Sequence, residues 1–188
     1  MKQKTPNPQG KGLSTILDEL NRSQSKQSLP PKNIDQVSSE LFTSLFVLNT
    51  NFQFRPIVGK SYWLYYTSDK FKLFMIAPDD WACGHPGIFI GECLLQDDIT
   101  WTINLDQKIA NEGWFIKHIE EQRDRVQHSL EDSASLEEAM PYYVSGMSYY
   151  SRLLAYGLGT SLKVSMQRAG INALAYEQAK GLLSHKTS

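Results

Sequence analysis

The residues best suited to chemistry gather between positions 79 and 101 of the chain. This stretch brings together carboxylates, a histidine, thiols and indoles: Asp79, Asp80, Trp81, Cys83, His85, Glu92, Cys93, Asp97, Asp98 and Trp101. Groups of these kinds bind metals or orient small ligands when they converge in a concave site. One functional hypothesis is therefore a small-ligand or catalytic pocket at one end of a sheet, formed by Trp81, His85, Glu92, Asp97, Asp98 and Trp101.

The same stretch has an interpretation that needs no ligand. Cys83, His85 and Cys93 lack a fourth zinc ligand at a standard spacing, so we expect neither a metal nor a cofactor. Aspartates commonly cap turns, and an indole beside a strand more often packs in the core than against a ligand. His85 would need an orienting hydrogen bond and a nearby substrate to act as a general base. No catalytic residue is therefore assigned.

Cysteine usage and the apolar runs indicate a cytoplasmic protein. The chain has two cysteines, whereas a secreted domain of this size more often carries several pairs. No apolar h-region follows the N-terminal Met-Lys-Gln-Lys, and no uncharged apolar run reaches the ~18 residues of a spanning helix. We expect reduced, buried thiols and no membrane segment.

The charge of the chain argues against nucleic-acid binding through bulk electrostatics. The formal net charge is -1 and the pI is about 6.4. The aromatic stretch 62–66 could stack single-stranded bases, but only Lys60, Lys70 and Lys72 lie nearby in the sequence. We expect this stretch to be a buried central strand and expect no nucleic-acid partner.

A second functional hypothesis comes from the N-terminal region. Its apolar residues follow i, i+3, i+4, i+7 spacing, at Leu13, Ile16, Leu17 and Leu20. A helix this short is unstable alone, so it must dock either on its own core or in a groove of a protein partner. We expect residues 1–32 to form a flexible arm around this short amphipathic helix.

The rest of the chain reads as one α+β domain, residues 33–188. A wide apolar stripe predicts a helix over 34–48, with Asn33 as N-cap and Gln36 completing a capping box. Alternating or β-prone residues then predict strands at about 52–56, 62–67, 71–77, 88–95 and 99–105, with a hairpin turn at 68–70. Short links between them favour an antiparallel meander of about five strands.

Helical spacing returns after residue 106. Ile116, Ile119, Val126 and Leu130 line one face of a helix, although Arg123 interrupts it. A capping box at Ser135 and Glu138 predicts another helix start, and longer helices are expected over 148–168 and 172–183. The predicted fold is thus a mostly antiparallel sheet packed with N- and C-terminal helices, the latter as a helical extension.

Several short segments carry a family resemblance in their order and spacing. They read Gly-Lys-Ser-Tyr-Trp-Leu-Tyr at 59–65, Ile-Ala-Pro-Asp-Asp-Trp at 76–81, Phe-Ile-Gly-Glu at 89–92 and Leu-Leu-Gln-Asp-Asp-Ile-Thr-Trp-Thr at 94–102. Together they resemble the family known as domain of unknown function 2452, and the helices from Ser135 onward look like those of a bacterial branch. Other members often have Pro-His before the fourth strand, where this chain has His85-Pro86. The resemblance implies a fold unit and brings no accepted activity.

The leading hypothesis is an interaction or regulatory module without catalysis. The chain contains no P-loop, no dinucleotide-binding glycine turn, no HExxH and no nucleophile elbow. The tethered apolar set at 13–20 is the feature most typical of a partner-binding segment. The pocket between Trp81 and Trp101 is the alternative, as a ligand-binding protein or an enzyme.

Overall fold

The structure of the protein, a computed structural model, describes residues 29–184. In chain order these residues form α2 (Ile34–Leu48), β1 (Ser61–Thr67), β2 (Lys70–Phe74), β3 (Ile88–Leu95), β4 (Trp101–Leu105), α3 (Gly113–Glu131), α4 (Tyr149–Ala169) and α5 (Tyr176–Ser184). Single 3₁₀ turns lie at Pro78–Asp80 and Ile109–Asn111. The predicted α+β class is confirmed, with four antiparallel strands where about five were expected.

The strand order corrects the predicted meander. The sheet runs β2-β1-β3-β4, so β1 pairs with both β2 and β3, and the loop 75–87 carries the chain past β1. The register of β1 on β3 shifts between Leu64 and Tyr65, where Ile90 is the extra residue of a bulge. Side chains alternate along β1, so Tyr62 packs against Trp101 in the core whereas Tyr65 packs against Trp81 on the opposite face.

The expected strand at 52–56 is wrong. Its alternating aromatic rings pack by stacking instead of by strand pairing: Phe54 lies between Phe52 and Tyr62, with ring centroids 5.5 and 5.2 Å away. Only Asn51 bridges to β2, through Lys72. Pro56 has no N–H to offer a ladder, so the period-two pattern reflects core packing without a strand.

Backbone conformation fixes the ends of the other strands. Ser68 and Asp69 have φ of 49° and 57°, which closes the predicted β1–β2 turn. Ile99 has a φ of 66° and lies in the β3–β4 turn, so β4 begins at Trp101 and not at Ile99. One face of β4 is open to solvent, since Thr102 and Asn104 are exposed.

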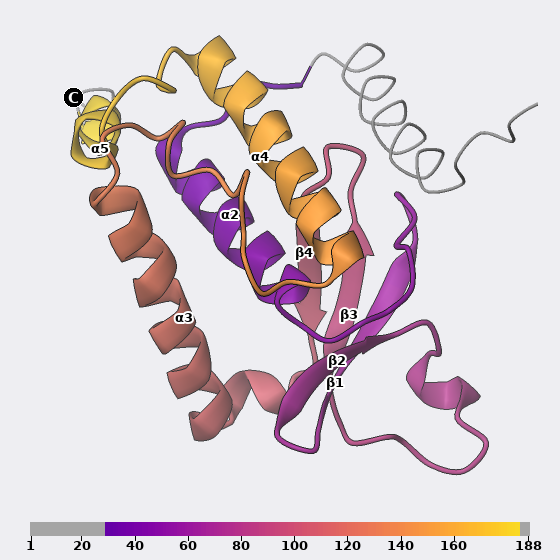
Figure 1. Cartoon of the computed structure of the whole chain (residues 1–188). Helices are drawn as coiled ribbons and strands as arrows, with labels where there is room; N and C mark the ends of the chain where they lie inside the picture. Colours follow the sequence, from indigo (N-terminus) through magenta and orange to yellow (C-terminus); the bar gives the residue numbers. More distant parts are fainter. Residues whose placement is uncertain (1–28, 185–188) are drawn as a thin grey trace, which may run out of the picture.

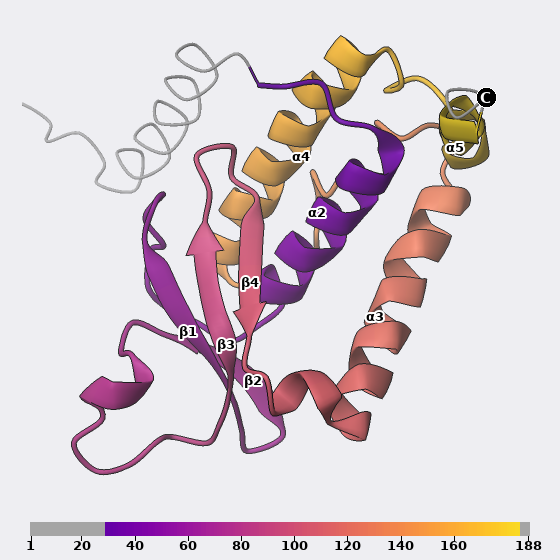
Figure 2. The ribbon, with the colours of Figure 1, turned by 180° about the vertical axis from the view of Figure 1, so that it is seen from behind.

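Helix α2 is the centre of the fold. The predicted capping box forms, because Asn33 accepts from the Gln36 N–H and Gln36 accepts from the Asn33 N–H. Its apolar stripe is buried at Ile34, Val37, Leu41, Phe46, Val47 and Leu48. Figures 1 and 2 show α2 and α4 covering one face of the sheet, and among residues 29–184 no helix covers the other face.

The C-terminal part completes this core. Helix α4 follows the Ser148 N-cap and ends at Gly170, whose φ is 73°, and it buries Leu154, Leu158, Leu162 and Met166. Gly159 allows the Tyr142 ring to approach closely, since an added Cβ would lie 3.1 Å from it. The predicted capping box at Ser135 is only half formed, because the Glu138 N–H donates to the Ser135 hydroxyl at 3.4 Å. It starts no helix; these residues lie in a series of turns that Pro141 follows.

One buried hydrogen bond joins α2 to the open edge of the sheet, where the Trp101 N–H donates to the Ser44 hydroxyl at 2.9 Å. Ser44→Ala leaves this buried N–H without a partner and should lower the free energy of unfolding by about 1–2 kcal/mol. Urea denaturation measures the effect. The matched control is Ser39→Ala, because Ser39 is exposed on the same helix and gains the same helix propensity. An equal effect at both positions would contradict this role for Ser44.

Candidate functional site

Helix α3 leaves one part of its apolar stripe uncovered, at Ile116. Only Phe115 and Leu130, near its two ends, are buried along the helix. Between them Ile119 and Val126 are partly buried and Ile116 is 41% exposed. In Figure 1 the helix stands beside α2 and away from the sheet, attached at both ends. The sequence pattern predicted a core-facing stripe here; the structure packs Ile119 and Val126 against the core as well and leaves Ile116 exposed.

A groove lies between α2 and α3, and we refer to it as the α2–α3 groove. Its apolar half is a hollow of about 340 Å³, walled by α2 and α3 and closed by β4; its apolar lining comes from Phe42, Phe46, Ile103, Leu105, Ala110, Phe115, Ile116 and Ile119. Leu105 on the sheet edge is 38% exposed. Apolar side chains that gather around an open hollow are typical of a surface that binds another molecule.

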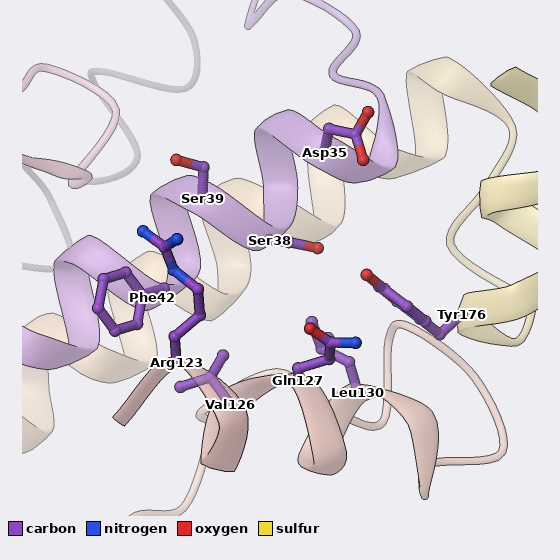
Figure 3. Close-up of a pocket in the computed structure, with 9 residues that line it drawn as sticks. All are labelled: Asp35, Ser38, Ser39, Phe42, Arg123, Val126, Gln127, Leu130 and Tyr176. Atoms are coloured by element: carbon purple, nitrogen blue, oxygen red, sulfur yellow. The ribbon is translucent and has the colours of Figure 1, made fainter. Parts of the chain in front are cut away.

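The second half of the groove is more polar, as Figure 3 shows. It is a hollow of about 260 Å³ between α2, α3 and α5, and it shares Phe42 and Arg123 with the apolar half. The hydroxyls of Ser38 and Tyr176 point into it, beside the amide of Gln127. The Ser38 hydroxyl oxygen is buried and has no hydrogen-bond partner in the structure. This half therefore offers one unused buried hydroxyl, that of Ser38, next to an apolar floor.

Arg123 sits where the two halves meet. Its guanidinium carbon lies 5.2 Å from the centre of the Phe42 ring, within the range of a cation–π contact. Arg123, which interrupts the apolar stripe of α3 in the sequence, thus covers the Phe42 ring with its guanidinium group. From Phe115 to Leu130 the groove follows about 22 Å of helix α3.

A compact charge cluster holds the start of α2 to the β3–β4 turn. The ammonium of buried Lys32 lies 2.5 Å from Glu40 and 2.6 Å from Asp98, whose other carboxylate oxygen accepts from Thr100. Burial by itself lowers the pKa of Lys32, but hydrogen bonds to Asp98 and Glu40 outweigh it and the pKa is raised. Burial raises the pKa of Asp98, but the hydrogen bonds from Lys32 and Thr100 prevail and lower it.

The third member of this cluster behaves in the opposite way. Burial raises the pKa of Glu40 by more than the hydrogen bond from Lys32 lowers it. Asp97 lines the adjacent hollow of about 470 Å³, together with Leu29 and Thr102. Of the candidate ligand-binding residues, Asp98 is therefore one of the two carboxylates that Lys32 holds, and Asp97 lines the hollow beside them.

Trp81 and His85 lie at a different place, around Tyr65 on the sheet face that no helix covers. The Trp81 indole N–H donates to the Tyr65 hydroxyl at 3.1 Å, and the rings of Trp81 and His85 lie 6.1 and 6.2 Å from the Tyr65 ring. Phe74 and Phe89 complete this cluster. Burial raises the pKa of Tyr65, and the hydrogen bond from Trp81 only partly opposes it.

The remaining two candidates lie apart again. Trp101 is buried in the core against Tyr62, on the helix side of the sheet, and Glu92 pairs with Asn104 in the middle of β3. The structure therefore does not bring the six candidate side chains into one pocket. It places them in the Tyr65 cluster, in the Lys32 cluster, in the core and on β3. A ligand-binding role for any of these groups stays a prediction.

The two thiols differ sharply in their surroundings. Cys93 is fully buried in β3, and burial raises its pKa to about 12. Cys83 is exposed in the loop before β3, so the expectation that both thiols are buried is wrong for it. The loop 75–87 extends away from the sheet (Figure 2) and offers no core position for it.

Two searches of the described residues complete this picture. Between residues 29 and 184, no three His, Cys, Asp or Glu side chains gather closely enough to hold a metal ion. No helix in that range combines the length and apolar character needed to cross a bilayer. The candidate partner-binding residues Leu13, Ile16, Leu17 and Leu20 lie outside the described range.

Sequence reasoning did not identify the groove or the role of Lys32. The interruption of the α3 stripe by Arg123 was a visible signal, since a helix packed along its whole length seldom places arginine on its inner face. Lys32 gave no signal, because its partners Glu40 and Asp98 are 8 and 66 residues away in the sequence.

Comparison with known proteins adds one finding. The model of the family described as protein of unknown function (DUF2452) matches residues 32–137, which run from Lys32 through the sheet and α3. No curated protein and no solved structure matches the chain. Both walls of the groove, α2 and α3, lie inside the matched range.

Replacing Lys32 tests the charge cluster. Lys32→Met should lower the free energy of unfolding at pH 7 by about 3 kcal/mol, because Glu40 and Asp98 then lie partly buried without a cation. Chemical denaturation measures this loss, with exposed Lys60→Met as the matched control. Equal stabilities of the two variants would contradict the role of the cluster.

The same variant has a predicted pH dependence. The pKa of Asp98 is lower in the folded protein than in the unfolded chain, so ionised Asp98 stabilises the fold at pH values above its pKa in the unfolded chain. This stabilisation is lost as the pH falls through the pKa of Asp98 in the folded protein. Glu40, with its raised pKa, contributes in the opposite sense. Without Lys32 both carboxylates favour protonation, so the variant gains relative stability on acidification. The stability gap between the two proteins should therefore narrow from pH 7 towards about pH 4, and a gap that widens would refute this account.

Thiol labelling tests the contrast between the cysteines. Native protein should react quickly with one equivalent of a thiol reagent at pH 8, because only Cys83 is exposed and Cys93 has a pKa of about 12. Denatured protein should react with two. Cys83→Ser should abolish the fast native reaction, and a persisting fast phase would show that Cys93 is accessible.

Proposed function

The chain belongs to the DUF2452 family, and from that premise we propose that it is an interaction and regulatory module that binds an amphipathic helix of a protein partner in the α2–α3 groove. The proposal assigns no catalytic step to the protein. The partner is defined by its chemistry: a helix of two to three turns with apolar residues at i, i+3, i+4 and i+7.

The partly uncovered stripe of α3 is the observation that carries this proposal. A surface helix normally buries its apolar stripe against the body of the protein. Here Ile116 and Leu105 remain 41% and 38% exposed and face the same hollow. Fully burying an exposed aliphatic side chain contributes about 1.5–3 kcal/mol, so covering the exposed parts of Ile116 and Leu105 contributes about 1 kcal/mol each.

The shape of the groove favours a helix over other occupants. Helices α2 and α3 form its long walls along about 22 Å of α3, and a docked helix would displace the Arg123 side chain from Phe42, where it separates the two hollows. Two parallel ridges of side chains with an apolar floor are the usual receptor for a docked helix.

The polar half fits the end of such a helix. The last carbonyl groups of a helix have no intrahelical partners and need donors from elsewhere. Ser38 and Tyr176 supply hydroxyl donors at this end of the groove. We therefore propose that the docked helix points its C-terminus towards α5.

Site-specific photocrosslinking in the cells that produce the protein tests the proposal. A benzophenone amino acid at Ile116, inside the groove, should crosslink to a protein segment with the stated apolar spacing, which peptide mass spectrometry identifies. The same probe at Ile57 is the matched control, because Ile57 is 53% exposed and does not line the groove. Adding Ile119→Glu should reduce the Ile116 crosslink at least tenfold.

Two outcomes would overturn the proposal. One is a crosslink pattern at Ile116 that matches the pattern at Ile57. The other is crosslinked segments without helical apolar spacing, since these would indicate nonspecific apolar binding and not a groove that binds a helix.

A further inference from the structure

We infer that a further hollow, between the C-terminal end of α2, the β1–β2 hairpin and α3, binds the phosphate monoester group of a small molecule. We refer to it as the hairpin hollow. Its volume is about 410 Å³, and its nitrogen-bearing side chains are Asn49, Asn51, Lys70, His118, Gln122 and Arg125. The inference goes beyond the proposed function, because it concerns a different ligand at a different site.

The hairpin hollow and the α2–α3 groove lie on different sides of α3. His118, Gln122 and Arg125 follow one another at i, i+4 and i+7, so they share one side of the helix. Ile116 and Arg123, which line the groove, lie roughly 140° away around the helix axis. A ligand in the hairpin hollow therefore does not occupy the place of a helix docked in the groove.

The lining of the hairpin hollow carries positive charge without a counter-charge. Lys70 and Arg125 line it, and no aspartate or glutamate of the described residues does. Neither cation forms an ion pair within residues 29–184. The carboxylates next to them in the sequence, at Asp69, Glu121 and Asp124, do not line the hollow. Cations that share a concave site in this way attract anions from solution.

The nearby end of α2 does not account for these cations. The last carbonyl groups of a helix lack intrahelical partners and attract positive charge. In α2, however, the Leu45 carbonyl accepts from the Asn49 N–H at 2.9 Å. The Val47 carbonyl accepts from the N–H and from the hydroxyl of Thr50, at 3.0 and 2.7 Å. The chain itself thus supplies donors to these carbonyls, and the two cations remain available to a ligand.

The charge and the donors of the hollow match a phosphate monoester. Such a group carries about −1.5 to −2 charge at pH 7 and three oxygens that accept hydrogen bonds. Lys70 and Arg125 supply two positive charges, and a guanidinium binds phosphate through two parallel N–H groups. The amides of Asn49, Asn51 and Gln122 add neutral donors. A carboxylate, with a single charge and two oxygens, would satisfy fewer of these groups.

The aromatic side of the hollow suits the organic part of a small ligand. The His118 ring lies against two phenyl rings, with its centroid 5.0 Å from that of Phe71 and 6.2 Å from that of Phe46. Within the described residues the imidazole nitrogens make no hydrogen bond, so they can bind a hydroxyl of the ligand. A volume of about 410 Å³ lies within the range of small-molecule sites.

Proton–nitrogen correlation NMR of the full chain, at constant pH and ionic strength, tests the inference. Glycerol 3-phosphate should shift the side-chain amide signals of Asn49, Asn51 and Gln122, with a dissociation constant on the order of 1 mM or below. Inorganic phosphate should shift the same signals. Acetate should bind at least about tenfold more weakly, because it makes fewer charge-assisted hydrogen bonds.

Charge-neutral variants separate specific binding from general attraction. Arg125→Gln and Lys70→Gln should each weaken the binding of glycerol 3-phosphate about tenfold, because each removes a charge-assisted hydrogen bond. The matched control is Lys117→Gln, since Lys117 is exposed on the same helix as Arg125 but does not line the hollow. Backbone amide signals that stay in place outside the hollow show that each variant is folded.

Three results would overturn the inference. The first is the absence of amide shifts at about 10 mM glycerol 3-phosphate. The second is equal weakening by Lys117→Gln and Arg125→Gln, which would indicate attraction by net charge alone. The third is binding of a phosphoserine peptide but not of glycerol 3-phosphate, which would assign the hollow to a protein partner. Each result leaves the crosslink at Ile116 as a separate measure of the proposed function, because Ile116 lines the groove.

Discussion

The burial of helix α2 against both the sheet and α4 is the constraint on which the rest of the structure depends. Its stripe from Ile34 to Leu48 is almost fully buried, and Ser44 accepts from the edge strand at Trp101. Because α2 packs against the sheet on one side and against α4 on another, only a narrow side of its surface is left for a further helix. That remaining side carries Asp35, Ser38, Ser39 and Phe42, which cannot bury a third helix completely.

The position of α3 follows from this limit. It packs Phe115, Ile119, Val126 and Leu130 against the core, and the Arg123 side chain reaches across to lie over Phe42. Ile116, on the same stripe, stays 41% exposed. The groove is thus a consequence of how α2 packs, and it lies within the range that the family model matches.

The charge cluster at Lys32 serves the same architecture. Lys32 begins the matched range and ties the entry to α2, through Asp98, to the β3–β4 turn. Buried ion pairs contribute little net stability compared with apolar packing, but they strongly penalise the loss of one partner. The cluster therefore fixes the entry of the chain into α2 beside the β3–β4 turn.

The sequence by itself determined the elements whose signals are local. The capping box at Asn33, the Ser148 and Gly170 ends of α4 and the span of β3 all agree with the structure, because caps, turns and periodicity act over a few residues. Only the tertiary structure decided the strand order, the stacking of Phe52 and Phe54 without a strand, the separation of Trp81 from Trp101, and the pairing of Lys32 with Asp98. Each of these depends on contacts between distant residues, and the alternation or charge of one segment does not reveal which distant segment will pack against it.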